Sequence, residues 1–141
     1  MNTITIQFDG GCQPNPGQKY GSYHILNSHG EKILGQQRVR LGFGTNNEAE
    51  FDTLEMALDD LLDDMDQNKV SPAKYHLAII TDSKIVRNRL LKNTIHKKPK
   101  WIEASTRMFN LAEKCLVHIR RFSGFKAIWK PRESNVAAFG H

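Results

Sequence analysis

Residues 45–66, TNNEAEFDTLEMALDDLLDDMD, form the strongest helix signal in the chain. Thr45 is followed three residues later by Glu48, which is the spacing of a capping box at a helix start. Apolar residues then recur at helical spacing, and they are Phe51, Leu54, Leu58, Leu61, Leu62 and Met65. These features predict one long amphipathic helix.

The acids of this helix fall into two groups. At about 100° per residue, Glu50 lies within the arc of Leu54 and Leu61. The opposite side carries Asp52, Asp59, Asp63 and Asp66. We interpret the acidic run as a solvated face and Glu50 as the exception, an acid that points toward the protein.

The segment before the helix is rich in strand signals. Residues 3–9 alternate, with Ile and Phe on one face and polar residues on the other. Residues 10–21 are dense in Gly, Pro and Asn and predict a turn. Residues 20–27 and 31–40 predict two further strands, joined by a hairpin turn at 27–30. Three consecutive strands on short connections predict an antiparallel meander.

The second half of the chain predicts a parallel strand and further helices. Residues 75–82 contain a continuous apolar run, which suits a central parallel strand covered on both faces. The other predicted elements are a basic helix at 84–92, a basic loop at 93–100, a helix at 101–120 with Ile102 on its apolar side, a strand at 125–131 and a helix of under two turns from Ser134 or Asn135. We expect a single α/β domain over residues 1–141.

Charge is segregated along the chain, although the net charge is only +5. Residues 48–66 hold nine acids and no Lys or Arg, whereas residues 84–132 hold 14 basic residues and two acids. This asymmetry favours a polyanionic partner that touches the second half. A merely solvated basic surface would have the same composition.

The composition also bears on location. No apolar run approaches the ~20 residues that a membrane span needs, and residues 1–11 lack the basic start and apolar stretch of a signal peptide. Cys12 and Cys115 are too few for a disulfide framework. We therefore expect a cytoplasmic monomer with two thiols and no membrane partner.

Three acids have settings in which they could hold a metal ion. Asp9 ends the first predicted strand, Glu50 lies one turn into the helix, and Asp82 closes the central strand. In an open α/β sheet, sites gather at strand ends beside helix termini, so we expect these carboxylates to meet. Like charges at such distances repel each other unless a cation neutralises them. Mg²⁺ suits such a site because it takes oxygen ligands.

Each acid also has a simpler interpretation. Asp9 with Gly10 would form a turn, and Asp82 with Ser83 would cap the following helix. Glu50 would be a partly buried acid paired with Lys or Arg. For each acid taken singly, the simpler interpretation is favoured over a metal site. The motifs around the three acids together favour the metal site.

Those motifs resemble type 1 ribonuclease H. Their order is DGG-C-x-x-NPG from residue 9, TNN-x-x-E from residue 45, TDS from residue 81, and W-x-x-R-x-SN ending at residue 135. The resemblance covers about residues 3–138. It implies a ribonuclease H-like fold: a five-stranded mixed sheet, three antiparallel strands followed by two parallel ones, flanked by helices.

The resemblance implies an endonuclease that cleaves the RNA strand of an RNA/DNA hybrid and leaves 5′-phosphate and 3′-hydroxyl ends. Asp9, Glu50 and Asp82 would be the catalytic residues and metal ligands. Glu48 falls where the family has no catalytic Glu, and the capping box explains it. Two Mg²⁺ ions about 4 Å apart are expected with substrate, with Mn²⁺ as a substitute.

Substrate-binding residues follow from the same resemblance. Asn46 and Asn47 match paired asparagines that read the 2′-hydroxyl and base edges in the minor groove. Thr45 and Asn15 match positions that hold a DNA-strand phosphate, and a helix-cap role competes for Thr45. Further matching positions are Gly11, Cys12 and Gln13 in the loop near the RNA strand, and Ser83, Arg132 and Asn135 in the later motifs.

Two of these matches are looser. Arg132 would stand in for a loop His that helps product release in many members. Trp101, with the neighbouring Lys97, Lys98 and Lys100, would form a platform for the DNA strand. The connection from Asp82 to Trp101 is too short for the extended basic protrusion of some members, and Trp101 as plain core is an equal alternative.

The chain departs from the family at its end. Where the last motif has an Asp four residues after the Asn, this sequence has Phe139. Three explanations compete: a truncated C-terminal helix, a three-carboxylate site that holds its second metal weakly, or substitution by the imidazole or terminal carboxylate of His141. A disordered end is favoured over the last.

The leading hypothesis is an active hybrid nuclease, more active in Mn²⁺ because a depleted site holds Mg²⁺ less well. The alternative is a catalytically weak hybrid-binding module with an incomplete metal site. A third hypothesis, a related enzyme that acts on DNA, is disfavoured by Asn46 and Asn47.

Overall fold

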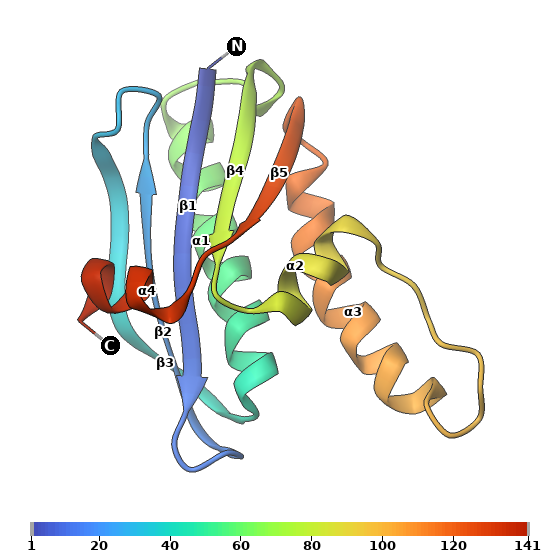
Figure 1. The fold of residues 1–141 in the computed structure, drawn as a ribbon. Coiled ribbons are helices and arrows are strands. Elements are labelled where there is room, and N and C mark those ends of the chain that lie inside the picture. The colour runs from blue at the N-terminus through green and yellow to red at the C-terminus, as the bar shows by residue number, and fades with distance from the viewer. Residues whose placement is uncertain (1, 141) are drawn as a thin grey trace.

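A computed structural model describes residues 2–140 and shows one five-stranded sheet flanked by helices (Figure 1). The strands are β1 (Asn2–Cys12), β2 (Gly17–Leu26), β3 (Lys32–Gly44), β4 (Tyr75–Thr81) and β5 (Gly124–Trp129). Their order across the sheet is β3-β2-β1-β4-β5, so β1 is central. β1, β2 and β3 pair antiparallel, whereas β4 pairs parallel with β1 and β5. The predicted mixed sheet is confirmed.

The first strand is longer than the sequence indicated. β1 continues past Asp9 to Cys12, so Asp9 lies inside the strand, opposite Ser22 of β2. The predicted turn over 10–21 is therefore wrong in its extent, because only residues 13–16 connect the two strands. β3 is longer than its predicted range in the same way.

Gly10 explains why strand residues looked like turn residues. A Cβ atom at Gly10 would lie 2.3 Å from the carbonyl oxygen of Ala49 in the following helix. Glycine is therefore needed at this position for the close approach of strand and helix. The sequence pattern cannot separate this requirement from that of a turn.

Helix α1 (Asn46–Gln67) packs across one face of the sheet and forms the core with it (Figure 1). Thr45 Oγ1 accepts from the Glu48 backbone N–H, and Glu48 Oε1 accepts from the Thr45 N–H, which confirms the capping box. The largest fully buried side chains include Phe8, Phe51, Ile6, Ile25, Leu54, Leu58, Leu61, Leu77 and Ile79. Burial of this stripe fixes the rotation of α1 and turns Glu50 toward the sheet, as predicted.

The acidic side of α1 is not simply solvated, and that interpretation needs correction. Two of its acids have partners on neighbouring elements, in the pairs Lys19–Asp52 and His118–Asp59, and Asp60 of the same acidic run accepts from the Tyr23 hydroxyl. Asp63 and Asp66 are exposed, as expected. The helical period predicts the direction in which these acids point. It does not predict their partners, because the partners lie on strands and helices that are distant in the chain.

A short helix, α4 (Arg132–Phe139), covers part of the opposite face of the sheet, in front of β1 to β3 in Figure 1. It begins at Arg132 rather than at Ser134 or Asn135, and its eight residues make slightly over two turns. Asn135 and Phe139 are buried. Packing on the sheet stabilises a helix that would be marginal alone.

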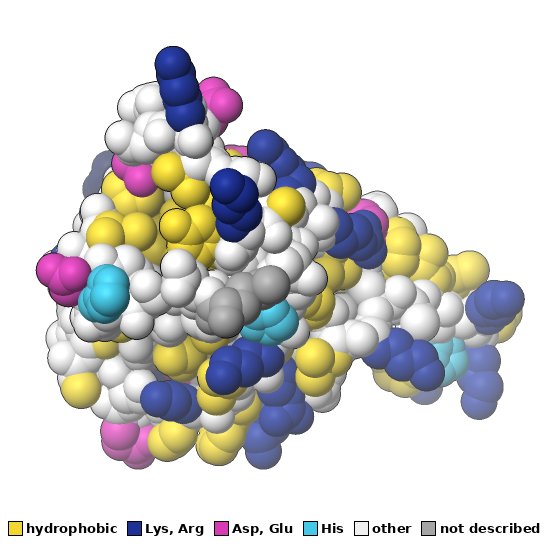
Figure 2. All heavy atoms as spheres, turned by 90° about the horizontal axis from the view of Figure 1, so that it is seen from above, with side chains coloured by type: hydrophobic (Ala, Val, Ile, Leu, Met, Phe, Trp, Pro, Cys, Tyr) yellow, Lys and Arg dark blue, Asp and Glu magenta, His cyan; other side chains and the backbone are white. Residues whose placement is uncertain are grey.

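Helices α2 (Lys84–Leu91) and α3 (Ile102–Ile119), with the connection at 92–101, form an arm that extends beyond the sheet (Figure 1). The second half of α3 is buried against the core, but Ile102 is 45% exposed, contrary to prediction. Figure 2 shows basic side chains gathered toward the outer end of this arm. A 3-10 turn (Pro72–Lys74) precedes β4.

Two expectations from composition can be compared with the structure. None of the described helices has the length and apolar character that crossing a bilayer requires. Cys12 and Cys115 are both free thiols, as predicted.

Candidate active site

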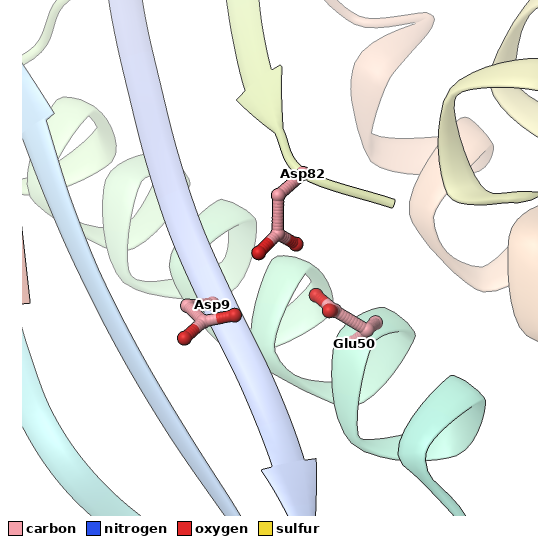
Figure 3. Close-up of side chains that lie close together, drawn as sticks. All are labelled: Asp9, Glu50 and Asp82. Carbon is pink, nitrogen blue, oxygen red and sulfur yellow. The ribbon is translucent and has the colours of Figure 1, made fainter. Parts of the chain in front are cut away.

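Asp9, Glu50 and Asp82 meet beside β1, with their carboxylates turned toward one another (Figure 3). Asp9 lies on β1, Glu50 in the second turn of α1, and Asp82 directly after β4. One ligand oxygen from each residue lies within 4.8 Å of the other two. The predicted meeting of the three acids is confirmed, although Asp9 reaches it from inside a strand.

Backbone pairing sets this arrangement. Gln7 of β1 lies opposite Ile80 of the parallel strand β4, so two residues further on Asp9 and Asp82 come alongside each other. Gly10 brings α1 against β1, and its N–H donates to Glu50 Oε2 at 3.3 Å. The three carboxylates are therefore held by one strand pair and one strand–helix contact.

Burial and mutual repulsion both oppose ionisation of the cluster. Glu50 is 8% exposed. Burial, followed by the charges of Asp9 and Asp82, raises the pKa of Glu50 well above its usual range. Burial and the Asp82 charge raise the pKa of Asp9 to about 6, against opposing effects of Arg132 and Asn135. A cation among these oxygens would relieve both effects.

The simpler interpretations of the three acids do not hold. Among residues 2–140, no Lys or Arg forms an ion pair with Glu50. Ser83, rather than Asp82, caps α2, because its Oγ accepts from the Val86 N–H at 3.2 Å. Asp9 with Gly10 forms no turn. The substrate role predicted for Ser83 stays a prediction.

Side-chain amides tie the end of β1 to the start of α1. Asn46 Oδ1 accepts from the Cys12 N–H at 2.9 Å, and Asn15 Oδ1 accepts from the Asn46 N–H at 3.1 Å. A Cβ atom at Gly11 would lie 3.5 Å from the same Asn46 oxygen. Four residues predicted to bind substrate, Gly11, Cys12, Asn15 and Asn46, therefore lie together.

A groove of about 820 Å³ opens beside this junction. Its lining includes Thr45 and Asn47 together with Asn15 and Asn46. The facing helix α3 contributes two cationic side chains, Arg107 and Lys114, which sequence reasoning missed. Gln13 is exposed in the 13–16 turn. The groove thus joins hydrogen-bonding groups to positive charge.

Helix α4 brings Arg132 and Asn135 to Asp9. The Arg132 charge and a hydrogen bond with Asn135 both lower the pKa of Asp9. Asn135 is 1% exposed. Phe139, at the position expected for a fourth carboxylate, is buried, and its ring centroid lies 5.1 Å from that of His24. His141 lies outside the described residues.

The sequence profile of the RNase H family matches residues 1–129. The chain belongs to the RNase H family. Members of this family are hydrolases that act on RNA and generally use divalent metal ions. Comparison with curated proteins found no match.

Solved RNase H structures share the fold. LC11-RNase H1, isolated from compost by metagenomics, is 25% identical with a TM-score of 0.72, covering 98% of this chain and 91% of that one. The N-terminal RNase H domain of a Mycobacterium tuberculosis protein, fused to maltose-binding protein, is 22% identical with a TM-score of 0.72, covering 95% and 91%. LC11-RNase H1 in complex with an RNA/DNA hybrid is 23% identical with a TM-score of 0.67, covering 95% and 89%.

The residues assigned to a DNA platform by the RNase H resemblance lie apart from the carboxylates. Trp101 is 51% exposed, and Lys100 Nζ lies 5.1 Å from its ring centroid, so the interpretation of Trp101 as core is wrong. Lys97 and Lys98 are exposed in the same connection. This segment lies at the outer end of the arm (Figure 1).

Two residues beside the RNase H carboxylates were not predicted. Trp129 Nε1 donates to the Asp82 carbonyl oxygen at 3.0 Å, with Lys84 Nζ 5.0 Å from the indole centroid. Gln7 contacts α4 from the face of β1 that carries Asp9. The alternation of β1 places Gln7 on that face, whereas the position of Trp129 depends on strand pairing between distant segments.

Proposed function

We propose that this RNase H family member cleaves the RNA strand of RNA/DNA hybrids, leaving 5′-phosphate and 3′-hydroxyl ends. Asp9, Glu50 and Asp82 would hold two Mg²⁺ ions, with Mn²⁺ as a substitute. A single chain supplies all three carboxylates, which supports action as a monomer.

One observation carries the proposal: three carboxylate oxygens lie within 4.8 Å of one another, and one belongs to the buried Glu50. Within residues 2–140, the ligand atoms that converge there are all oxygens, which fits a hard divalent cation such as Mg²⁺. Bound divalent ions would supply charge neutralisation at the phosphate and activation of a water for in-line attack. The donor set therefore fits the metal that the family implies.

The remaining residues support the recognition of a hybrid. Asn46 Oδ1 already accepts from the Cys12 N–H, so the Asn46 side-chain amide is oriented before substrate arrives, while Asn15 Oδ1 accepts from the Asn46 backbone N–H. An oriented amide at the groove suits the 2′-hydroxyl, which separates RNA from DNA. Arg107 and Lys114 face it across the groove and suit a phosphate backbone. The hybrid bound to LC11-RNase H1 is consistent with this substrate class.

The test is cleavage of end-labelled duplexes by the full chain. The substrates are an RNA/DNA hybrid, duplex DNA and duplex RNA, each in Mg²⁺ and in Mn²⁺. We expect cleavage of the hybrid RNA strand alone, faster in Mn²⁺ because a site without the fourth carboxylate holds Mg²⁺ weakly. End analysis of the fragments checks for 5′-phosphates.

A matched pair of variants locates the chemistry. Glu50→Gln keeps the shape of a buried side chain and removes its charge, and should reduce cleavage more than 100-fold, roughly the effect of losing a catalytic group. Glu55→Gln makes the same change on the same helix away from the cluster and should stay within about twofold. Tight hybrid binding without cleavage in either metal would instead support a hybrid-binding module.

A further inference from the structure

A chain of buried polar side chains lies beneath Asp9, between the sheet and α4. Gln7 is two residues before Asp9 on β1, and successive side chains two apart share one face of a strand. Gln7 is 8% exposed and Asn135 is 1% exposed. Buried amides need fully matched donors and acceptors, so the orientation of each constrains the next.

A backbone carbonyl fixes the orientation of the Gln7 amide. Gln7 Nε2 lies 3.2 Å from the Ser134 carbonyl oxygen, which can only accept. The same nitrogen lies 3.1 Å from Ser134 Oγ and 3.0 Å from Asn135 Oδ1. The amide nitrogen of Gln7 must therefore face α4, and its Oε1 must face away from α4.

His24 completes the other side of Gln7. His24 Nε2 lies 3.2 Å from Gln7 Oε1, so this ring nitrogen carries the hydrogen. Desolvation, followed by the charge of Lys32, lowers the pKa of His24, which favours the neutral ring. The His24 ring also packs on Phe139, at the far end of α4. Gln7 is thus held from both sides.

The orientation of Gln7 determines that of Asn135. With its Oδ1 directed at Gln7, the Asn135 amide presents its Nδ2 donor on the opposite side. Nδ2 is buried and forms no hydrogen bond of ordinary geometry with any group among residues 2–140, so it remains available to the nearby Asp9 carboxylate, whose pKa it lowers. Turning the amide over would put an oxygen next to the Asp9 carboxylate.

We propose that Gln7 is a positioning residue for Asp9, because it holds the Asn135 amide with its oxygen toward Gln7 and its nitrogen toward the Asp9 carboxylate. The inference rests on the proposed function in one respect, the role of Asp9 in the reaction. Within residues 2–140 the side-chain hydrogen bonds of Gln7 go to Ser134, Asn135 and His24, and Gln7 does not line the groove, so it acts through Asn135.

The experiment compares two glutamines that both hold α4. Gln7→Met keeps length and packing but cannot donate. Gln37→Leu is the control, because Gln37 Nε2 donates to the Phe139 carbonyl oxygen at 2.6 Å rather than to the Asn135 side chain.

Each ¹⁵N-labelled full chain is measured by NMR for the Asn135 side-chain amide signal, which is assigned from its loss in Asn135→Asp. Steady-state cleavage of the hybrid in saturating Mg²⁺ gives kcat and KM.

We expect Gln7→Met to shift the Asn135 amide signal and speed its exchange with solvent. It should lower kcat about tenfold, the usual effect of losing an outer partner of a metal ligand, with KM for the hybrid within about twofold. Gln37→Leu should leave the amide signal unchanged and kcat within about twofold. If Gln7→Met does not fold, Gln7→Glu keeps the shape and should turn the Asn135 amide over, with the same loss of kcat.

Three results would overturn the proposal: an unchanged Asn135 signal in the Gln7 variants, an unchanged kcat, or an equal loss in Gln37→Leu, which would mean that docking of α4 alone matters. Cleavage by Asp9→Asn distinguishes failure of this proposal from failure of the proposed function. If Asp9→Asn still cleaves, the proposed function fails, while the NMR comparison still decides whether Gln7 orients Asn135.

Discussion

Glu48 and Glu50 differ by two positions on α1 and have opposite surroundings. Glu48 is half-buried and closes the capping box with Thr45. Glu50 is buried, bonded to the Gly10 N–H, and near two other acids. A helical step of about 100° per residue is enough to send the two side chains to different environments.

The raised pKa of Asp9 predicts a pH-dependent stability effect. Its folded pKa of about 6 exceeds its ordinary value of 3.8, so above pH 6 the folded protein carries an unfavourable ionised carboxylate. Asp9→Asn should therefore stabilise the metal-free protein at pH 8 by about 1 kcal/mol, after allowance for solvent screening. This gain should fade as pH falls from 6 toward 4, where the folded wild type takes up the proton first.

Urea unfolding in EDTA at pH 8 and pH 5 measures this difference. Asp63→Asn, an exposed acid on α1, is the control and should change stability little at either pH. A stabilisation by Asp9→Asn that is equal at both pH values would contradict the assigned cause.

At the residue scale, the sequence predicted side-chain directions that follow from the helical period. It did not predict contacts between residues that are far apart in the chain. Glu50 was found because its direction follows from residues within three turns of the same helix. The basic partners of two acids on α1, Lys19 for Asp52 and His118 for Asp59, were missed because they come from β2 and α3. Gln7 and Ser134 are 127 residues apart, and no local pattern reports their contact.

At the scale of elements, β1 shows why the ends of helices and strands were harder to predict than whether a segment is a helix or a strand. All five strands and the four α-helices were expected, yet β1 extends through Gly10 and Gly11, residues that usually mark turns. The start of α4 was misplaced because packing on the sheet sustains it where propensity alone would not. The meeting of Asp9, Glu50 and Asp82 was predictable because it depends on the order of the elements, and that order was right.

Thr45 joins two roles, helix cap and groove wall. Thr45→Val keeps the shape and removes the hydroxyl, so it should lower the free energy of unfolding by about 1 kcal/mol. It should also raise KM for the hybrid, because Thr45 lines the groove. Thr45→Ser keeps the hydroxyl and should restore both values. Thermal unfolding and steady-state cleavage measure the two effects, and a normal KM in Thr45→Val would argue for a cap role alone.

The arm should contribute to binding through charge. Replacing Lys97, Lys98 and Lys100 with Ala should weaken hybrid binding and flatten its dependence on salt, because fewer counterions are released. Fluorescence anisotropy with a labelled hybrid in Ca²⁺, at several KCl concentrations, measures both. Replacing three exposed lysines elsewhere, Lys69, Lys74 and Lys126, is the control for net charge. Equal losses in both triple variants would show that only net charge matters.

At the scale of the whole molecule, metal binding should stabilise the fold. A ligand that binds only the folded state at about 100 times its Kd adds about 2.7 kcal/mol, which corresponds to a rise in Tm of roughly 5–10 °C for a domain of this size. Wild type in Mg²⁺ should show this rise over a KCl control of equal ionic strength. Glu50→Gln should show little of it in calorimetry, and a full rise in that variant would place the metal elsewhere.

The parallel pairing of β1 with β4 also determines the order in which the parts of the active site can form during folding. It joins residues 2–7 to residues 75–80, whereas β1, β2 and β3 pair with near neighbours in the chain. Pairings between distant segments form slowly because a long loop must close first. A collapsed intermediate with only the first three strands and α1 would hold Asp9 and Glu50 without Asp82. During refolding, nuclease activity should therefore appear later than helical circular dichroism.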